Sequence, residues 1–200
     1  ATDGHKLVKT TTKTQKKANI INSLVLPVKF LNIIKNIYQP KEKIIINISD
    51  NHIEVQQQTL TVLSRIIKES FPDFNSVIPE NNKTNIIIKT EEVLSSLKRV
   101  SIFSNKTTKQ VVLSFSSKGI TLSTQDIESS TSAKEHLDCK FDGAEVTSSY
   151  NAKYLTEVVK HLNTQKTTIY LNSALTAALF KPEKEKEKTT ALLMPIRINQ

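Results

Sequence analysis

Apolar and polar positions divide the chain into segments that recur in one order: a strand, a helix, a hairpin and a further strand. The first set begins with an apolar strand at residues 24–26 and an amphipathic helix at 28–38. A hairpin at 43–57, with the turn signal Ser-Asp-Asn inside it, and a strand at 61–67 follow. This order predicts a β-α-β-β-β unit.

The same order occurs twice more. The second set comprises a strand at 85–90, a helix at 91–103, a hairpin at 109–125 and a strand at 133–141. The third comprises a strand at 144–150, a helix at 152–162, a hairpin at 167–181 and a final strand at 191–198. Residues 4–13 precede all three and predict a final strand that lacks its own helix and hairpin.

Each expected helix has a recognisable start. Pro27 suits a first helical turn, and Asn151 can cap the third helix with its side chain. Thr90 is expected to cap the second helix with its hydroxyl, with Glu91 and Glu92 in the first turn. Gly119 is expected to take positive φ in the second hairpin.

The three units predict an α+β fold in which helices cover one face of antiparallel sheets. With two units per domain, residues 83–200 form a complete domain, and residues 1–82 form a domain truncated at its N-terminal side. The polar segment 79–84 is the expected linker between them.

The net charge of +9 suggests a polyanionic partner such as a nucleic acid. Coding bias is the alternative explanation, because nearly all of the basic residues are lysine and the chain is rich in Asn and Ile. The single cysteine, Cys139, precludes an internal disulfide and fits a reducing compartment. Since neither a signal peptide nor a long apolar run is present, we expect a cytoplasmic protein without membrane contact.

The residues offer little chemistry for catalysis. The three glycines lie far apart and make no phosphate-binding loop, and the four histidines have no metal-ligand spacing. No nucleophile elbow accompanies Asp3 and His5, so they are expected to be surface residues and not part of a hydrolase site. Cys139 is expected in the core. We therefore expect no enzyme, no cofactor and no metal.

Five segments resemble one family, in the right order across the whole chain. They are "ATDGHKL" (1–7), "FPDFNSVIP" (71–79), "LKRVSIFSNKTTKQVVLSF" (97–115), "YNAKYLTEVV" (150–159) and "LLMPIRI" (192–198). The chain thus resembles the bacterial DNA polymerase III beta subunit, the DNA sliding clamp. The resemblance implies the DNA clamp fold, with residues 1–82 as the truncated second domain and 83–200 as the third.

The resemblance also implies a function. Two full-length subunits of the family join head to tail as a homodimeric ring around duplex DNA, held without sequence specificity. The ring acts as a non-catalytic processivity factor. Short linear peptides tether the DNA polymerase III alpha subunit, the clamp-loader delta subunit, other polymerases and repair proteins to it.

Basic residues on the polar sides of the three helices are the expected DNA-facing groups, since lysine attracts phosphate without reading bases. The alternative is that these are ordinary solvated helix faces. The residues are Lys29, Lys35, Lys98, Arg99, Lys153 and Lys160.

In the family, partner peptides enter a hydrophobic groove between the second and third domains. Lys6, Ser76 and Thr108 differ from the residues common in the best-known members. Each apolar groove residue could alternatively be ordinary core, which is the assignment preferred for Leu193 and Ile198. The groove residues implied by the resemblance are Thr2, Gly4, His5, Lys6, Leu7, Pro72, Val77, Asn151, Tyr154, Leu175, Ala177, Leu192, Met194, Pro195, Ile196 and Arg197.

The family's ring interface corresponds to Ile102 and Phe103, with Lys98 and Arg99 nearby as ion-pair donors. Without a first domain to cover this patch, we expect the chain to be monomeric or to form a different contact through it.

Finally, the two ends of the chain, 1–7 and 192–198, are expected to meet in the groove.

Two other functions have weaker support in the sequence. A general α+β nucleic-acid-binding module would need aromatic stacking residues on an open sheet, but aromatics make up only 6% of the chain. A hydrolase would need motifs that the sequence lacks.

Overall fold

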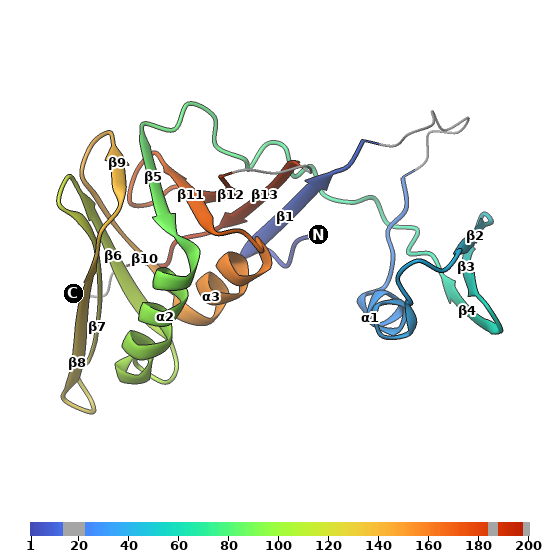
Figure 1. The fold of residues 1–200 in the computed structure, drawn as a ribbon, viewed down its shortest axis with the longest axis horizontal. Coiled ribbons are helices and arrows are strands. Elements are labelled where there is room, and N and C mark those ends of the chain that lie inside the picture. The colour runs from blue at the N-terminus through green and yellow to red at the C-terminus, as the bar shows by residue number, and fades with distance from the viewer. Residues whose placement is uncertain (14–22, 184–187, 198–200) are drawn as a thin grey trace. The chain divides into compact units, whose positions relative to one another are not determined.

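The computed structural model describes residues 1–13, 23–183 and 188–197 (Figure 1). Its contacts divide the chain into two compact units. The larger unit contains Ala1–Thr14 and Phe74–Gln200, and the smaller unit contains Gln15–Asp73. The predicted domain boundary between residues 82 and 83 stays a prediction.

The larger unit contains two antiparallel sheets. The six-stranded sheet has the order β1 (Lys6–Thr11), β13 (Lys188–Leu193), β12 (Ala178–Pro182), β11 (Lys166–Leu171), β5 (Thr84–Lys89) and β9 (Lys140–Asp142). The four-stranded sheet has the order β10 (Val146–Asn151), β6 (Gln110–Ser116), β7 (Gly119–Asp126) and β8 (Thr131–Leu137).

Two amphipathic helices, α2 (Thr90–Val100) and α3 (Ala152–His161), lie side by side against these sheets (Figure 1). The short 3-10 helix η1 (Ser101–Phe103) continues α2. Leu97 of α2 and Leu155 of α3 are fully buried in one apolar core that includes strands of both sheets. The expected α+β architecture, with helices covering sheets, is therefore confirmed.

One of the three helix starts follows the expectation. Asn151 caps α3, because its side chain accepts hydrogen bonds from the amides of Lys153 and Tyr154. Pro27 lies one residue before its expected place in the first turn of α1, at the cap position with an extended backbone. The expected cap by Thr90 is wrong: its hydroxyl bonds Thr167 Oγ1 at 2.9 Å, and Lys89 occupies the cap position without a side-chain bond.

The expected strand at 133–141 is split between the two sheets. β8 pairs with β7, whereas β9 pairs with β5. Cys139 lies between them, half-buried against the core. Gly119 takes φ +127° as expected, and a Cβ there would collide with the carbonyl of Leu137.

The two ends of the described chain meet as expected. β1 pairs antiparallel with β13, with Lys6 opposite Leu193 and Leu7 opposite Leu192. The final strand ends earlier than expected, at Leu193, and Pro195, which has no backbone N–H to donate, follows two residues later. β1 thereby becomes the edge strand of the six-stranded sheet.

The smaller unit consists of α1 (Val28–Ile37) and the three-stranded sheet β2 (Ile45–Ile48), β3 (His52–Gln57) and β4 (Leu60–Arg65). An isolated bridge joins Val25 to Ile67, the expected opening and closing strands of this unit. Phe30 packs with Ile53 and Val55 in its small core.

Two structural features bear on the class of protein. Across the described residues, no helix is long and apolar enough to span a membrane. In the same part of the chain, His, Cys, Asp and Glu side chains form no group of three that could hold a metal ion.

Candidate partner-binding surface

The segment after β13 ties the two sheets of the larger unit together. The amide of Met194 donates to the carbonyl of His5 at 2.9 Å, which extends the pairing with β1 beyond the end of the strand. Two residues later, the Ile196 amide donates to the Ser149 carbonyl of β10 at 2.8 Å, and the Ser149 hydroxyl donates to the Ile196 carbonyl at 2.7 Å. The backbone of this segment is therefore fixed at both ends.

A small apolar cluster lies where β1 and β13 pair. Leu7 from β1, Leu192 from β13 and Ala177 from the connection between β11 and β12 are buried together. Leu179 is buried with them, and Phe74, Ile78 and Tyr170 pack partly against the cluster. The three sequence-predicted groove residues Leu7, Ala177 and Leu192 therefore share one packed base.

Other predicted groove residues expose their apolar side chains to solvent. Leu175 is 75% exposed, Val77 is 51% exposed and Met194 is 43% exposed. Pro195 and Ile196 are half-buried. We define the junction surface as the buried Leu7, Ala177 and Leu192 together with the exposed Leu175 and Met194.

A charged network adjoins the start of β1. Lys6 Nζ lies 2.9 Å from Asp3 Oδ2 and 3.0 Å from Glu157 Oε2 of α3. The same ammonium lies 4.3 Å from the ring centre of Tyr154, on which the His5 ring also stacks. Lys6, His5 and Tyr154, all predicted groove residues, are therefore in mutual contact through Tyr154.

The charge of Asp3 is stabilised by its neighbours. Burial alone raises the pKa of this carboxyl, but bonds from the Lys6 side chain and from the Lys6 and His5 amides lower it from 3.8 to about 2. The bond to Asp3 is in turn the main cause of the raised pKa of Lys6. Both groups are therefore charged at neutral pH.

Thr2 and Gly4 shape the turn before β1. The Thr2 hydroxyl donates to the Lys6 carbonyl at 3.0 Å and accepts a bond from the Gly4 amide at 3.3 Å. Gly4 has φ +85°, a conformation that favours glycine. These contacts give both residues a structural role.

The remaining predicted groove residues are placed as follows. The Asn151 side chain caps α3 and donates to the Thr108 carbonyl at 3.0 Å. Arg197 has an exposed side chain, while its carbonyl accepts from Gln110. Pro72 belongs to the smaller unit, so its assignment stays a prediction. Leu193 is buried, as preferred, and Ile198 lies outside the described residues.

The predicted DNA-facing residues differ in how free their charges are. Lys98, Lys153 and Lys160 are exposed on α2 and α3, and Lys29 and Lys35 are exposed on α1 of the smaller unit. Arg99 of α2, also a predicted DNA-facing residue, is different. Its guanidinium donates two hydrogen bonds of 2.7 Å to the Glu135 carboxylate of β8. This pair raises the pKa of Arg99 and lowers that of Glu135.

The predicted ring-interface residues are both exposed on η1. Ile102 is 73% exposed and Phe103 is 41% exposed. At this exposure Ile102 contributes little to the stability of the unit, whereas Phe103 keeps more than half of its side chain away from solvent.

The sequence interpretation missed the two acidic residues that pair with Lys6. Asp3 was assigned to the surface generally, and Glu157 was not singled out. The pattern Asp-Gly at 3–4, a turn signal, could have pointed to Asp3. Glu157 follows Tyr154 by three residues and therefore lies on the same side of α3, although the sequence does not indicate that Lys6 would reach it.

Comparisons with known proteins cover the whole chain. The model of the DNA polymerase III beta subunit central domain matches residues 1–73, and that of the C-terminal domain matches residues 75–197. The beta sliding clamp of Vibrio cholerae is 22% identical over 200 residues, covering 99% of this chain and 54% of the relative. That of Borreliella burgdorferi is 26% identical, covering 99% of this chain and 51% of the relative.

A solved structure also shows the fold. The sliding clamp of Pseudomonas aeruginosa bound to griselimycin superposes with a TM-score of 0.91 at 20% identity, covering 99% of this chain and 53% of that one. This chain thus spans about half the length of the relatives that it matches. Because two family models together match nearly all of its residues, the chain belongs to the DNA polymerase III beta subunit family, the non-catalytic sliding clamps of bacteria.

Proposed function

We propose that this chain forms part of a clamp subunit that encircles duplex DNA and tethers replication proteins to it. The partners are the DNA polymerase III alpha subunit, the clamp-loader delta subunit, and other polymerases and repair proteins. The full-length protein acts as a homodimeric ring in the cytoplasm. Membership of the family, over both of its matched domains, supports this proposal.

The observation that carries the proposal is the junction surface. Buried Leu7, Ala177 and Leu192 provide a fixed apolar base, beside which Leu175 and Met194 present exposed apolar side chains. Burial of apolar peptide side chains supplies affinity, and a few polar groups set the orientation. Methionine adapts its shape to different partners, which suits a surface that binds several proteins in turn.

Three polar residues are suited to orient a bound peptide. Lys6 and His5 both contact Tyr154, so their positions are restricted. Arg197 has an exposed side chain on the segment that continues from Met194. We propose that these groups contact the backbone or polar side chains of partner peptides.

Binding of a fluorescent peptide of the Gln-Leu-x-Leu-Phe type tests this function directly. We also propose that griselimycin, which is bound by the clamp of Pseudomonas aeruginosa, binds the junction surface of this chain. Griselimycin should then displace the fluorescent peptide competitively. Displacement by griselimycin with no dependence on peptide concentration would place the two ligands on different surfaces.

A further inference from the structure

The apolar base of the junction surface continues into a polar row on the same face of the six-stranded sheet. Successive side chains of a strand point to opposite faces, so residues two apart in one strand share a face. Lys9 follows Leu7 by two residues in β1, and Lys181 follows Leu179 by two residues in β12. A lysine therefore stands next to each of these two buried leucines.

The strand register places the two lysines in one row. Lys9 pairs with Thr190 of β13. Phe180 of β12 pairs with Ala191 of β13, so the next residue, Lys181, lies beside Thr190. Neighbouring strands are about 4.8 Å apart, which separates the backbones of Lys9 and Lys181 by about 10 Å. We define the basic row as Lys9, Thr190 and Lys181.

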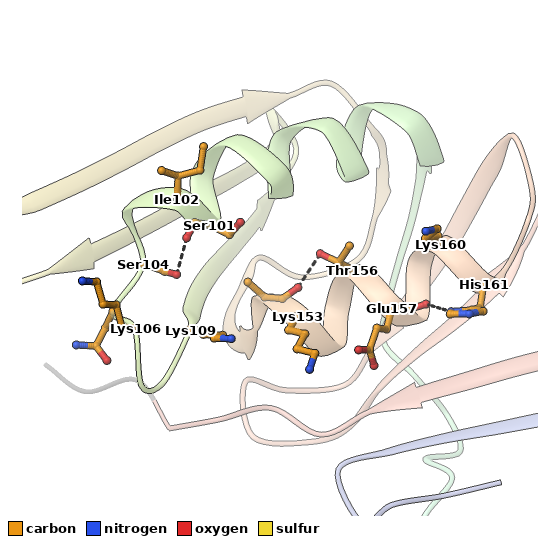
Figure 2. A pocket seen from close by; sticks show the side chains of 12 residues that line it. Ser101, Ile102, Ser104, Lys106, Lys109, Lys153, Thr156, Glu157, Lys160 and His161 are labelled. Carbon is orange, nitrogen blue, oxygen red and sulfur yellow. Dashed lines mark hydrogen bonds between the residues drawn. The ribbon is translucent and has the colours of Figure 1, made fainter. Parts of the chain in front are cut away.

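The basic row faces away from the helices of the larger unit. Lys6 of β1 pairs with Glu157 of α3, and Lys9, an odd number of residues later, points to the opposite face of the sheet. Figure 2 shows Glu157 on α3 together with two of the predicted DNA-facing residues, Lys153 and Lys160. The basic row is therefore a surface separate from the predicted DNA-facing residues of α3.

Aromatic rings restrict both ammonium groups of the basic row. Lys9 Nζ lies 5.1 Å from the ring centre of Phe74, and Lys181 Nζ lies 5.1 Å from that of Tyr170. A cation is attracted to the face of an aromatic ring. Phe74 and Tyr170 both pack against the apolar cluster that contains Leu7. The two charges are therefore held beside the base of the junction surface.

The described carboxylates leave these two charges unpaired. Among the residues that the structure describes, neither Lys9 nor Lys181 forms an ion pair, and Glu183 pairs with Lys166 instead. Lys9 Nζ donates a 3.4 Å hydrogen bond to the neutral amide oxygen of Asn75. Lys9 is exposed and Lys181 is half-buried. Both ammonium groups are thus open to an external anion.

We propose that the basic row binds acidic residues that flank the apolar motif of a partner peptide. The proposal rests on the peptide-binding function of the junction surface and deepens it by naming a chemical feature that selects among partners. An extended peptide advances about 3.3 Å per residue, so two residues cover the distance from one side chain to the next on the same face of a strand. Acidic residues directly beside the apolar motif can therefore reach the row.

An acidic peptide fits the basic row better than a nucleic acid does. The row contains two cations and adjoins an apolar base, whereas a nucleic-acid backbone presents a continuous series of charges. Lysine acts as a point charge without bidentate geometry, so aspartate and glutamate should serve equally well in the peptide.

The test compares two fluorescent peptides on the 200-residue chain by anisotropy. Both contain the sequence Gln-Leu-x-Leu-Phe, which is flanked on each side by Glu-Glu in the acidic peptide and by Gln-Gln in the neutral peptide. The readout is the ratio of the two Kd values, so that an effect of a variant on the shared apolar contacts cancels. The wild type should bind the acidic peptide about fivefold more tightly, the gain expected from two exposed charge pairs.

Three variants separate charge from structure. Lys9→Gln/Lys181→Gln should bring the ratio close to one, whereas Lys9→Arg/Lys181→Arg should keep it near the wild-type value because arginine retains the charge. The matched control is Lys118→Gln/Lys134→Gln, which removes two exposed charges from the turn between β6 and β7 and from β8. The control should leave the ratio unchanged. Circular dichroism verifies that all three variants are folded.

Salt gives a second readout. The salt slope, which is the change in log affinity per log unit of salt concentration, should be steeper for the acidic peptide because ions screen exposed charge pairs. This difference in slope between the two peptides should disappear in Lys9→Gln/Lys181→Gln.

The possible failures are distinguishable. A wild-type ratio near one, or a ratio that Lys9→Gln/Lys181→Gln and the control change equally, would overturn the proposal while the peptide-binding function stands. If the wild type binds neither peptide, the proposed function itself fails. An oligothymidylate that binds the wild type but not Lys9→Gln/Lys181→Gln, while the two peptides bind equally, would assign the row to a nucleic acid and would also overturn the proposal.

Discussion

The Nζ atom of Lys6 lies 3.0 Å from Oε2 of Glu157, and this ion pair joins the edge strand β1 to the helix α3. These residues are separated by most of the chain's length. The same lysine pairs with Asp3 at 2.9 Å and lies over the ring of Tyr154. Lys6 therefore links the turn before β1 with the helix α3 in one contact network.

The first prediction concerns acid pH. The folded-state pKa of Asp3 is about 2, below the ordinary value of 3.8, so its bonds stabilise the fold above pH 3.8 and lose their effect as the pH falls towards 2. Asp3→Asn should reduce the unfolding free energy at neutral pH by about 1 kcal/mol or less, since the group is partly exposed. Urea unfolding should show the gap between wild type and variant closing near pH 2. A gap that persists unchanged there would contradict the assignment.

The second prediction separates the base of the junction surface from its exposed part. Leu192 is 2% exposed, so Leu192→Ala should lower the unfolding free energy by about 2–5 kcal/mol through the cavity that it leaves. Leu175 is 75% exposed, so Leu175→Ala should change it by no more than about 0.5 kcal/mol. Urea denaturation of the larger unit measures both. Similar losses for the two variants would mean that Leu175 is part of the core.

The third prediction concerns charges on α2. Lys98→Gln should reduce the salt slope of DNA binding by about one, because this lysine forms no ion pair among the described residues. Arg99→Gln should reduce it less, because Arg99 is held by two 2.7 Å bonds to Glu135. Glu135→Gln serves as the control, since it should free Arg99 and steepen the slope. A larger effect of Arg99→Gln than of Lys98→Gln would contradict this ranking.

The fourth prediction concerns association. Ile102 and Phe103 are exposed on η1, and we expect the 200-residue chain to be a monomer by light scattering. If a contact forms through this patch, it should depend on concentration and be lost in Ile102→Ser/Phe103→Ser. Ile102→Ser should cost little stability because Ile102 is 73% exposed, whereas Phe103→Ser should cost more because Phe103 is only 41% exposed, so circular dichroism should confirm that the double variant is folded. A closed dimer that persists in this variant would contradict the role of the patch.

The sequence was sufficient to predict the repeated order of elements and the meeting of the chain ends. Apolar periodicity marked the three helices. The patterned segment at 4–13 contains β1, and the start of the segment at 191–198 belongs to β13, the strand next to it. Asn151 was recognisable as a helix cap because its side chain satisfies local amides. These features depend on short-range patterns or on the family resemblance.

Other features depend on long-range contacts that local patterns do not encode. The sequence predicts Thr90 as a helix cap, but its hydroxyl is hydrogen-bonded to the hydroxyl of Thr167 on the strand β11. The segment 133–141 has continuous alternation, yet tertiary pairing assigns its two parts to different sheets. The ion pairs Lys6–Glu157 and Arg99–Glu135 also join elements that are far apart in the sequence, so local patterns do not predict them.

Above all, we propose that the junction surface binds partner peptides. Titration of the wild-type chain with a fluorescent Gln-Leu-x-Leu-Phe peptide should give saturable binding. Leu175→Asp and Met194→Asp should each abolish it without unfolding the chain, since both side chains are exposed. Ile127→Asp is the matched control, because Ile127 is 79% exposed at the turn between β7 and β8. This variant should bind the peptide normally. Peptide binding that survives both Leu175→Asp and Met194→Asp, or that is lost equally in Ile127→Asp, would contradict the claim.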